Sequence, residues 1–151
     1  TLFPYTTLFR LCVEGLDLPV PIYIENTAGG TNAMARHLDR IAQLWQAVMS
    51  AGRNTDAVGF CLDTCHAHAG GLAMDTLVAD IRAITGRIDL VHANGSRDAA
   101  DSGADRHANL ADSLLDPAAV VAVVHEAAAP TIIETPGPLE AHRADLARLR
   151  G

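Results

Sequence analysis

The chain has 151 residues, of which 49% are hydrophobic and 19% charged, a composition typical of one globular domain rather than a disordered chain. Its formal net charge is −7 and all 11 basic residues are arginine, which excludes binding of nucleic acid through overall charge alone. Its apolar runs are too short to cross a membrane and no secretory signal is recognisable, so we expect a cytoplasmic protein without a membrane partner.

The first ten residues, TLFPYTTLFR, do not share the pattern of the rest of the chain. We expect residues 1–10 to be a leader foreign to the native protein. The folded domain is then predicted to cover residues 11–151 and to lack its upstream part.

From Leu11 onward, short apolar runs alternate with helical stretches rich in Ala and Leu. Strands are predicted at 21–24, 58–62, 88–91 and 131–133, and helices at 32–51, 74–85, 117–128 and 138–150. Nearly continuous apolar runs are typical of strands covered on both faces of a parallel sheet. Four β-then-α units predict either half of an eight-unit barrel, which needs about 250 residues, or a small open α/β sheet.

Local signals support two of these helices. In the first, six apolar residues share one helical face: Met34, Leu38, Ile41, Leu44, Trp45 and Val48. The third is expected to begin at Pro117 behind Asp116 as the capping residue. The Gly- and Asp-rich stretch 94–104 is predicted to be a long loop.

The three cysteines, Cys12, Cys61 and Cys65, are too few for a disulfide framework. Cys61 and Cys65 have the spacing of half a thiolate zinc site, but no second pair completes it. We therefore expect buried, reduced thiols.

Each predicted strand is followed by a carboxylate or an imidazole: Glu25, Asp63, His92 and Glu134. Because the carboxyl ends of parallel strands share one edge, these side chains are predicted to converge there. Three carboxylates in one place repel each other unless cations lie between them. The mixture of oxygen and imidazole donors predicts a site for Zn, Mn or Fe.

A second set of donors follows in the loops. His66 lies one turn past Asp63, and Asp105 and His107 form an Asp-x-His pair. Together His66, Asp105 and His107 predict a three-ligand site with an open coordination position. The remaining histidines have no such setting: His37, His125 and His142 are expected on helix surfaces, and His68 beside the site.

The strings ENTAGG, GFCLDTCHAHAGG, LVHANGSRD, DSGADRHAN and IIETPG resemble, in order and spacing, the signature segments of endonuclease IV, the metal-dependent AP endonuclease family. The resemblance runs from Leu11 to the C-terminus. It implies the C-terminal half of a TIM (β/α)8 barrel of the xylose isomerase-like kind.

The resemblance also implies zinc and a ligand set. The family binds three zinc ions, and Glu25 is similar to its catalytic carboxylate, which bridges two ions and holds the hydroxide with them. Asp63, His92 and Glu134 match the other ligands of one of these ions, and His66, Asp105 and His107 match the set of the third. The family's two remaining histidine ligands belong to the other half of the barrel.

The implied reaction is hydrolysis of the phosphodiester 5′ to an abasic site in double-stranded DNA, which leaves a 3′-hydroxyl. Arg97 and Arg106 are the expected DNA contacts, and we expect a monomer that is inactive without the other half-barrel. Two alternatives stay open: a metal-dependent sugar isomerase or epimerase of the related barrels, and a non-catalytic metal-binding fragment. Two loop departures from the family pattern, Gly95 in place of an Asp and 111–113 in place of a Gly-containing turn, are expected to weaken the support of the ligands.

Overall fold

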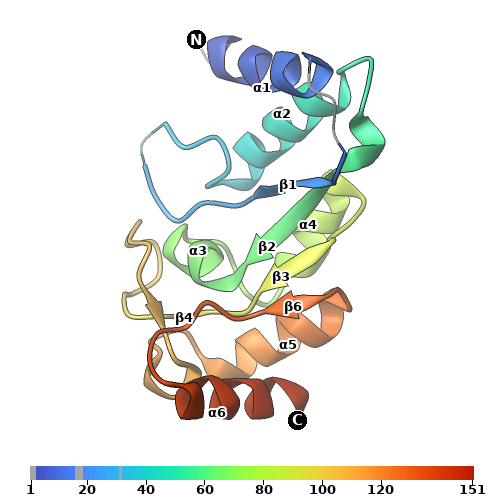
Figure 1. The fold of residues 1–151 in the computed structure, drawn as a ribbon. Coiled ribbons are helices and arrows are strands. Elements are labelled where there is room, and N and C mark those ends of the chain that lie inside the picture. The colour runs from blue at the N-terminus through green and yellow to red at the C-terminus, as the bar shows by residue number, and fades with distance from the viewer. Residues whose placement is uncertain (1–2, 16–18, 31) are drawn as a thin grey trace.

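The computed structural model describes residues 3–15, 19–30 and 32–151. Figure 1 shows a central sheet with helices packed along it, and helices α1 and α6 at opposite ends of the molecule. The elements in chain order are α1 (Phe3–Gly15), β1 (Ile22–Glu25), α2 (Leu38–Met49), η1 (Thr55–Ala57), β2 (Val58–Asp63), α3 (Thr64–Ala69), α4 (Leu77–Thr85), β3 (Leu90–His92), β4 (Gly95–Ser96), β5 (His107–Ala108), η2 (Leu110–Asp112), α5 (Pro117–Ala127), β6 (Thr131–Ile132) and α6 (Leu139–Arg150).

The main sheet has four parallel strands in the order β1-β2-β3-β6. The register places Glu25 beside Cys61 and Asp63 beside His92. The strand ends that carry the polar residues are therefore level with one another. All four predicted strands are present, and the α/β prediction is confirmed.

The two faces of the sheet differ because side chains alternate along each strand. From β2, Val58, Phe60 and Leu62 point into the apolar core formed with α2, α4 and α5. The Trp45 ring of α2 packs edge-on against Phe60, with ring centroids 6.2 Å apart. The alternate residues, Cys61 among them, face the other side of the sheet, which carries the polar strand ends.

Helix α2 begins later than the sequence predicted. Residues 32–37 form a loop in which Thr27 N–H donates to the Ala35 carbonyl and Ala33 N–H to the Gly30 carbonyl. His37 is thus the residue before the helix, not part of it. Met34 lies outside the helix as well, yet it is buried in the core. The prediction for the third helix is confirmed, because the Asp116 side chain accepts a hydrogen bond from Ala118 N–H ahead of Pro117.

Residues 3–10 belong to α1, a helix that the sequence pattern did not predict. Val13 of this helix is buried in the core, and its carbonyl accepts a hydrogen bond from the Asn54 side chain at 2.9 Å. Cys12 is exposed on the same helix. The expectation of buried, reduced thiols is confirmed for Cys61 and Cys65, which are buried and free. The foreign origin of residues 1–10 stays a prediction.

The stretch expected to be one long loop contains part of a small antiparallel pair, in which Gly95 lies opposite Ala108 and Ser96 opposite His107. Gly95 has no room for a side chain, since an added Cβ would lie 2.7 Å from Ser113 Cβ and 2.8 Å from the Ala108 carbonyl oxygen. The Ser113 hydroxyl accepts a hydrogen bond from Ser96 N–H at 3.0 Å. The two departures from the family pattern therefore meet in space and fit one another.

Strands β1 and β6 form the edges of the sheet. Apolar side chains are exposed on both, namely Ile22 and Tyr23 on β1 and Ile132 on β6. Open edges with apolar residues are the features expected of part of a barrel. Among the described residues, no helix has the length and apolar character needed to cross a membrane.

Candidate metal centre

Glu25, Asp63 and His92 are the last residues of β1, β2 and β3, and Glu134 lies two residues beyond β6. We call these four residues the inner cluster. Its centre is His92, whose Nδ1 lies 3.2 Å from Glu25 Oε1, 3.2 Å from Glu134 Oε2 and 3.8 Å from Asp63 Oδ2. The structure thus brings together the four side chains that the strand pattern singled out. Their role as metal ligands stays a prediction.

Two asparagines that the sequence reasoning did not single out hold the inner cluster in place. The Asn26 side chain donates to the Asp63 carbonyl and accepts from Asp63 N–H. The Asn94 amide nitrogen lies 2.7 Å from Asp63 Oδ2 and 3.3 Å from Glu134 Oε2, and its oxygen accepts from Glu134 N–H. Both asparagines are buried. Their positions, just past a strand-end ligand, were the signal that could have revealed them.

The second set, His66, Asp105 and His107, forms what we call the outer cluster. His66 lies in the short helix α3, Asp105 lies in the loop before β5, and His107 is the first residue of β5. Asp105 Oδ1 is 3.1 Å from His66 Nε2 and 3.3 Å from His107 Nε2. Asp63 joins the two clusters, because its Oδ2 also lies 3.9 Å from His107 Nε2.

The two outer histidines are oriented in the same way. His66 Nδ1 is 2.8 Å from the Asn26 carbonyl oxygen, and His107 Nδ1 is 3.4 Å from that of Glu134. With the ring proton on Nδ1, each imidazole donates to a backbone carbonyl and directs the lone pair of Nε2 toward Asp105. This is the arrangement that metal-binding histidines usually have.

The surroundings of His107 Nε2 indicate whether a cation fits the outer cluster. This nitrogen is buried and has no hydrogen-bond partner, although the acidic oxygens of Asp105 and Asp63 lie near it. An orphaned buried acceptor is costly, and the cost disappears when a cation binds it. The donor set of imidazole nitrogens and carboxylate oxygens suits zinc. The residues present therefore fit the metal that the sequence pattern implied.

The pKa shifts in the two clusters also favour a bound cation. Burial raises the pKa of Asp63 above its ordinary value, since the attraction of nearby His66 only partly offsets it. Burial alone would raise the pKa of Glu25, but the hydrogen bond from His66 and the charge of His92 lower it. Burial alone would lower the pKa of His66, but Glu25, Asp63 and Asp105 raise it to about 9. The site therefore favours positive charge among its carboxylates.

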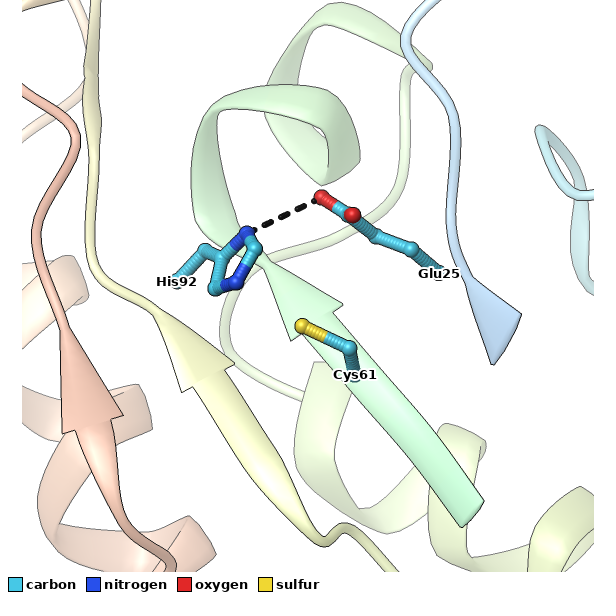
Figure 2. A group of neighbouring side chains, drawn as sticks. All are labelled: Glu25, Cys61 and His92. Carbon is cyan, nitrogen blue, oxygen red and sulfur yellow. Dashed lines mark hydrogen bonds and ion pairs between the residues drawn. The ribbon is translucent and has the colours of Figure 1, made fainter. Parts of the chain in front are cut away.

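Each cluster has a buried thiol beside it. Cys61 groups with Glu25 and His92, and Cys65 with Asp105 and His107, in each case with the possible ligand atoms within 4.8 Å of one another. Burial, together with the negative charge of Glu25 and Asp63, raises the pKa of Cys61 to about 12. Burial raises that of Cys65 to about 11, although a hydrogen bond with Ser96 opposes this. Figure 2 shows the Cys61 sulfur beneath the Glu25 carboxylate and the His92 ring.

The two arginines expected to contact DNA both have protein partners near the outer cluster. Arg97 Nε donates to the His107 carbonyl at 2.9 Å. Arg106 pairs with Asp98, with Nε 2.7 Å from Asp98 Oδ2.

His68 Nε2 lies 3.1 Å from the Asp98 carbonyl oxygen, on the loop that leads to the site. Of the histidines expected on surfaces, His37 and His125 are exposed, whereas His142 is half-buried.

A sequence model of the family described as xylose isomerase-like TIM barrel matches residues 11–151. The chain belongs to this family. Probable endonuclease 4 of Mycobacterium ulcerans (strain Agy99) is 52% identical to it over 142 residues, which are 94% of this chain and 54% of that protein. Probable endonuclease 4 of Mycobacterium tuberculosis (strain CDC 1551 / Oshkosh) is 51% identical over the same shares.

The fold agrees with these relatives. The crystal structure of endonuclease IV from Thermus thermophilus superimposes with a TM-score of 0.72 at 26% identity, covering 94% of this chain and 52% of that one. The chain spans about half the length of the relatives it matches. The resemblance to endonuclease IV is confirmed, and so is the prediction of a partial TIM barrel rather than a small open sheet.

Proposed function

We propose that this chain supplies most of the metal ligands in the active site of a zinc-dependent AP endonuclease. The proposed substrate is double-stranded DNA with an abasic site, and the reaction is hydrolysis of the phosphodiester 5′ to that site, leaving a 3′-hydroxyl. The proposal extends to a monomeric cytoplasmic enzyme of DNA base-excision repair. Its main support is the convergence of two clusters of potential metal ligands, joined through Asp63, at the carboxyl ends of the strands.

In this proposal the inner cluster holds zinc through Asp63, His92 and Glu134, and Glu25 is the bridging carboxylate toward a further ion. The outer cluster holds zinc through His66, Asp105 and His107. Bound zinc supplies the positive charge that activates water near neutral pH and neutralises a phosphate. Such a cation at the site also answers the objection that the chain as a whole is acidic.

The chain's own residues position these groups. Asn26 and Asn94 fix the Asp63 carboxylate by hydrogen bonds to its backbone and side chain. Glu25 Oε1 reaches both clusters, lying 3.2 Å from His92 Nδ1 and 3.3 Å from His66 Nδ1. This placement supports the catalytic role proposed for Glu25. We propose Arg97 and Arg106 as contacts for the DNA backbone, for which Arg106 must exchange Asp98 for a phosphate.

The outer cluster favours the nuclease over the sugar isomerase. An isomerase of the related barrels usually needs fewer ions, and the inner cluster alone would be enough for it. Here the outer histidines share Asp105 and are oriented by backbone carbonyls, which supports a further metal site. The relatives called probable endonuclease 4 agree with this choice.

A chimeric protein tests the proposal. This chain from Leu11 onward replaces the matching half of probable endonuclease 4 of Mycobacterium ulcerans, and the chimera is assayed for nicking of duplex DNA with one abasic site. We expect zinc-dependent nicking by the chimera, none by its Glu25→Gln variant, and none by the 151-residue chain alone. A folded, zinc-loaded chimera that does not nick, or that isomerises a simple ketose instead, would contradict the proposal.

A further inference from the structure

Among the four residues of the inner cluster, Glu134 receives the least support from the sheet. The other three end a strand, whereas Glu134 lies two residues beyond β6, a two-residue strand at the edge of the sheet. Its side chain is also the most exposed of the four, at 45%. Contacts outside the sheet are therefore needed to hold the backbone that carries this carboxylate.

Helix α6 supplies such contacts through the next residue, Thr135. The chain passes from β6 through Glu134 into α6 at one end of the molecule (Figure 1). The Thr135 hydroxyl donates to Asp145 Oδ2 at 2.8 Å. His142 Nε2 lies 2.8 Å from the Thr135 carbonyl oxygen, which accepts a hydrogen bond when the ring proton is on Nε2. Because His142 and Asp145 are three residues apart, they share one face of the helix.

Asp145 is itself held in the protein interior, where it is 2% exposed. Its Oδ1 accepts from Leu110 N–H at 2.9 Å, and its Oδ2 accepts from the Asn109 side chain at 2.7 Å as well as from Thr135. A buried carboxylate is costly unless its oxygens are hydrogen-bonded. Three donors therefore fix the Asp145 side chain, and Thr135 is bonded to a fixed point.

We propose that Asp145 and His142 are positioning residues for Glu134, which they hold through Thr135. The proposal rests on the zinc centre proposed above, because that centre makes Glu134 a zinc ligand. On the sheet side of the same segment, Asn94 Oδ1 accepts from Glu134 N–H at 2.8 Å. Residues 134–135 are thus held from the sheet and from α6, and the backbone so fixed directs the Glu134 side chain toward the inner cluster.

The attachment of α6 to the rest of the molecule does not depend on Thr135 alone. Leu149, near the end of α6, is buried in the apolar core. Its carbonyl oxygen lies 3.0 Å from His125 Nε2 of α5. These contacts hold α6 against α5 away from the site, whereas Asp145 and His142 both bond to the residue that follows Glu134.

The test compares two hydrogen bonds to the same oxygen, Asp145 Oδ2. Thr135→Val removes the bond that leads to Glu134, and Asn109→Ala removes the other. Both changes are made in the 151-residue chain with His66→Ala, in which only the inner zinc is expected, and zinc affinity is measured by competition with a chelating dye. We expect Thr135→Val to lower the affinity about tenfold or more, and Thr135→Ser, which keeps the hydroxyl, and Asn109→Ala to stay within about threefold.

Hydrogen exchange of the Glu134 amide gives a second measurement that needs no metal. This amide is bonded to Asn94, so its exchange in the zinc-free chain reports how firmly residues 134–135 are held. We expect exchange in Thr135→Val to be about tenfold faster than in Asn109→Ala. His142→Ala should change both measurements in the same direction by less, and it decides the question if Thr135→Val fails to fold by circular dichroism.

The outcomes separate the two proposals. If Thr135→Val leaves zinc affinity within threefold, or exchanges its Glu134 amide no faster than Asn109→Ala does, the positioning role is overturned and the zinc centre stands. If the His66→Ala chain binds no zinc, the zinc centre is contradicted. Faster exchange of the Glu134 amide in Thr135→Val would still support the positioning role in that case, and equal exchange would overturn it.

Discussion

The inner and outer clusters hold similar side chains on different kinds of support. Three of the four inner residues end a strand, and buried asparagines bond to Asp63 and Glu134. The outer residues lie on a six-residue helix, in a loop and at the start of the two-residue strand β5, and Asp105 is 61% exposed. The sheet therefore sets the geometry of the inner cluster before any ion binds. The outer histidines are oriented by contacts of their Nδ1 atoms with backbone carbonyls, and His107 Nε2 has no hydrogen-bond partner.

Substitution of Asp63 is expected to lower zinc affinity the most, because Asp63 belongs to both clusters. Its side chain is fully buried, and its oxygens face His92, His66 and His107. We expect Asp63→Ala to lower zinc affinity at both positions by more than about 100-fold. Competition titration against a chelating dye measures this. Retention of either zinc with unchanged affinity would show that Asp63 does not join the clusters.

A matched pair of histidine substitutions separates the clusters. His92→Ala should remove the inner ion and His66→Ala the outer one, so that each variant keeps one zinc per chain. Because the inner ligands are held by the sheet, we expect the zinc left in His66→Ala to bind more tightly than the one left in His92→Ala. Equilibrium dialysis of both variants checks this. Equal affinities would remove the distinction between the two supports.

Asn94 tests the hydrogen-bonded support itself. Asn94→Ala leaves every proposed ligand in place but removes the hydrogen bonds to Asp63 and Glu134. We expect inner zinc affinity to fall by about 10–100-fold, with a smaller effect on the outer ion. Asn109→Ala is the control, because that amide bonds to Asp145, outside the clusters. Equal losses of zinc affinity in the two variants would mean general destabilisation instead.

The pKa of His66 predicts a milder pH effect. It is raised from 6.5 to about 9, so in the metal-free chain the stability from protonated His66 is complete below about pH 6.5 and is lost as the pH rises through about 9. Zinc requires the neutral ring, so outer-site affinity should rise in this window by up to about tenfold per pH unit. Zinc titrations and metal-free melting curves across the window measure both trends. His66→Gln should abolish them, and a persisting slope would assign the proton to another group.

Much of this contrast could be predicted from sequence. The apolar runs before Glu25, Asp63 and His92 identify buried parallel strands, and the shared polarity of such strand ends follows from topology alone. Asp116 followed by Pro117 predicts the start of a helix. The Asp side chain can accept a hydrogen bond from a backbone N–H of the first turn, and proline is favoured at the first helical position. The main sheet, four helices and the proximity of the candidate ligands could therefore be predicted from the sequence.

Other features depend on tertiary contacts that have no local signal. Residues 32–37 have helical composition, but backbone hydrogen bonds to the loop after β1 hold them out of α2. The β4–β5 pair is two residues long on each side, too short for a period to be recognised. The fit of Gly95 with Ser113 joins positions 18 residues apart. Asn26 and Asn94 would have been found by asking which polar residues follow each strand-end ligand.

In the proposed metal centre, the side chains at the strand ends surround shared cations. The zinc content of the purified 151-residue chain, measured by mass spectrometry of the metal after dialysis against dilute zinc, tests this most directly. Glu25→Gln, which leaves three inner ligands and the whole outer set, serves as the comparison for partial loss. We predict two zinc ions per folded chain. A folded chain that retains no zinc would contradict the account.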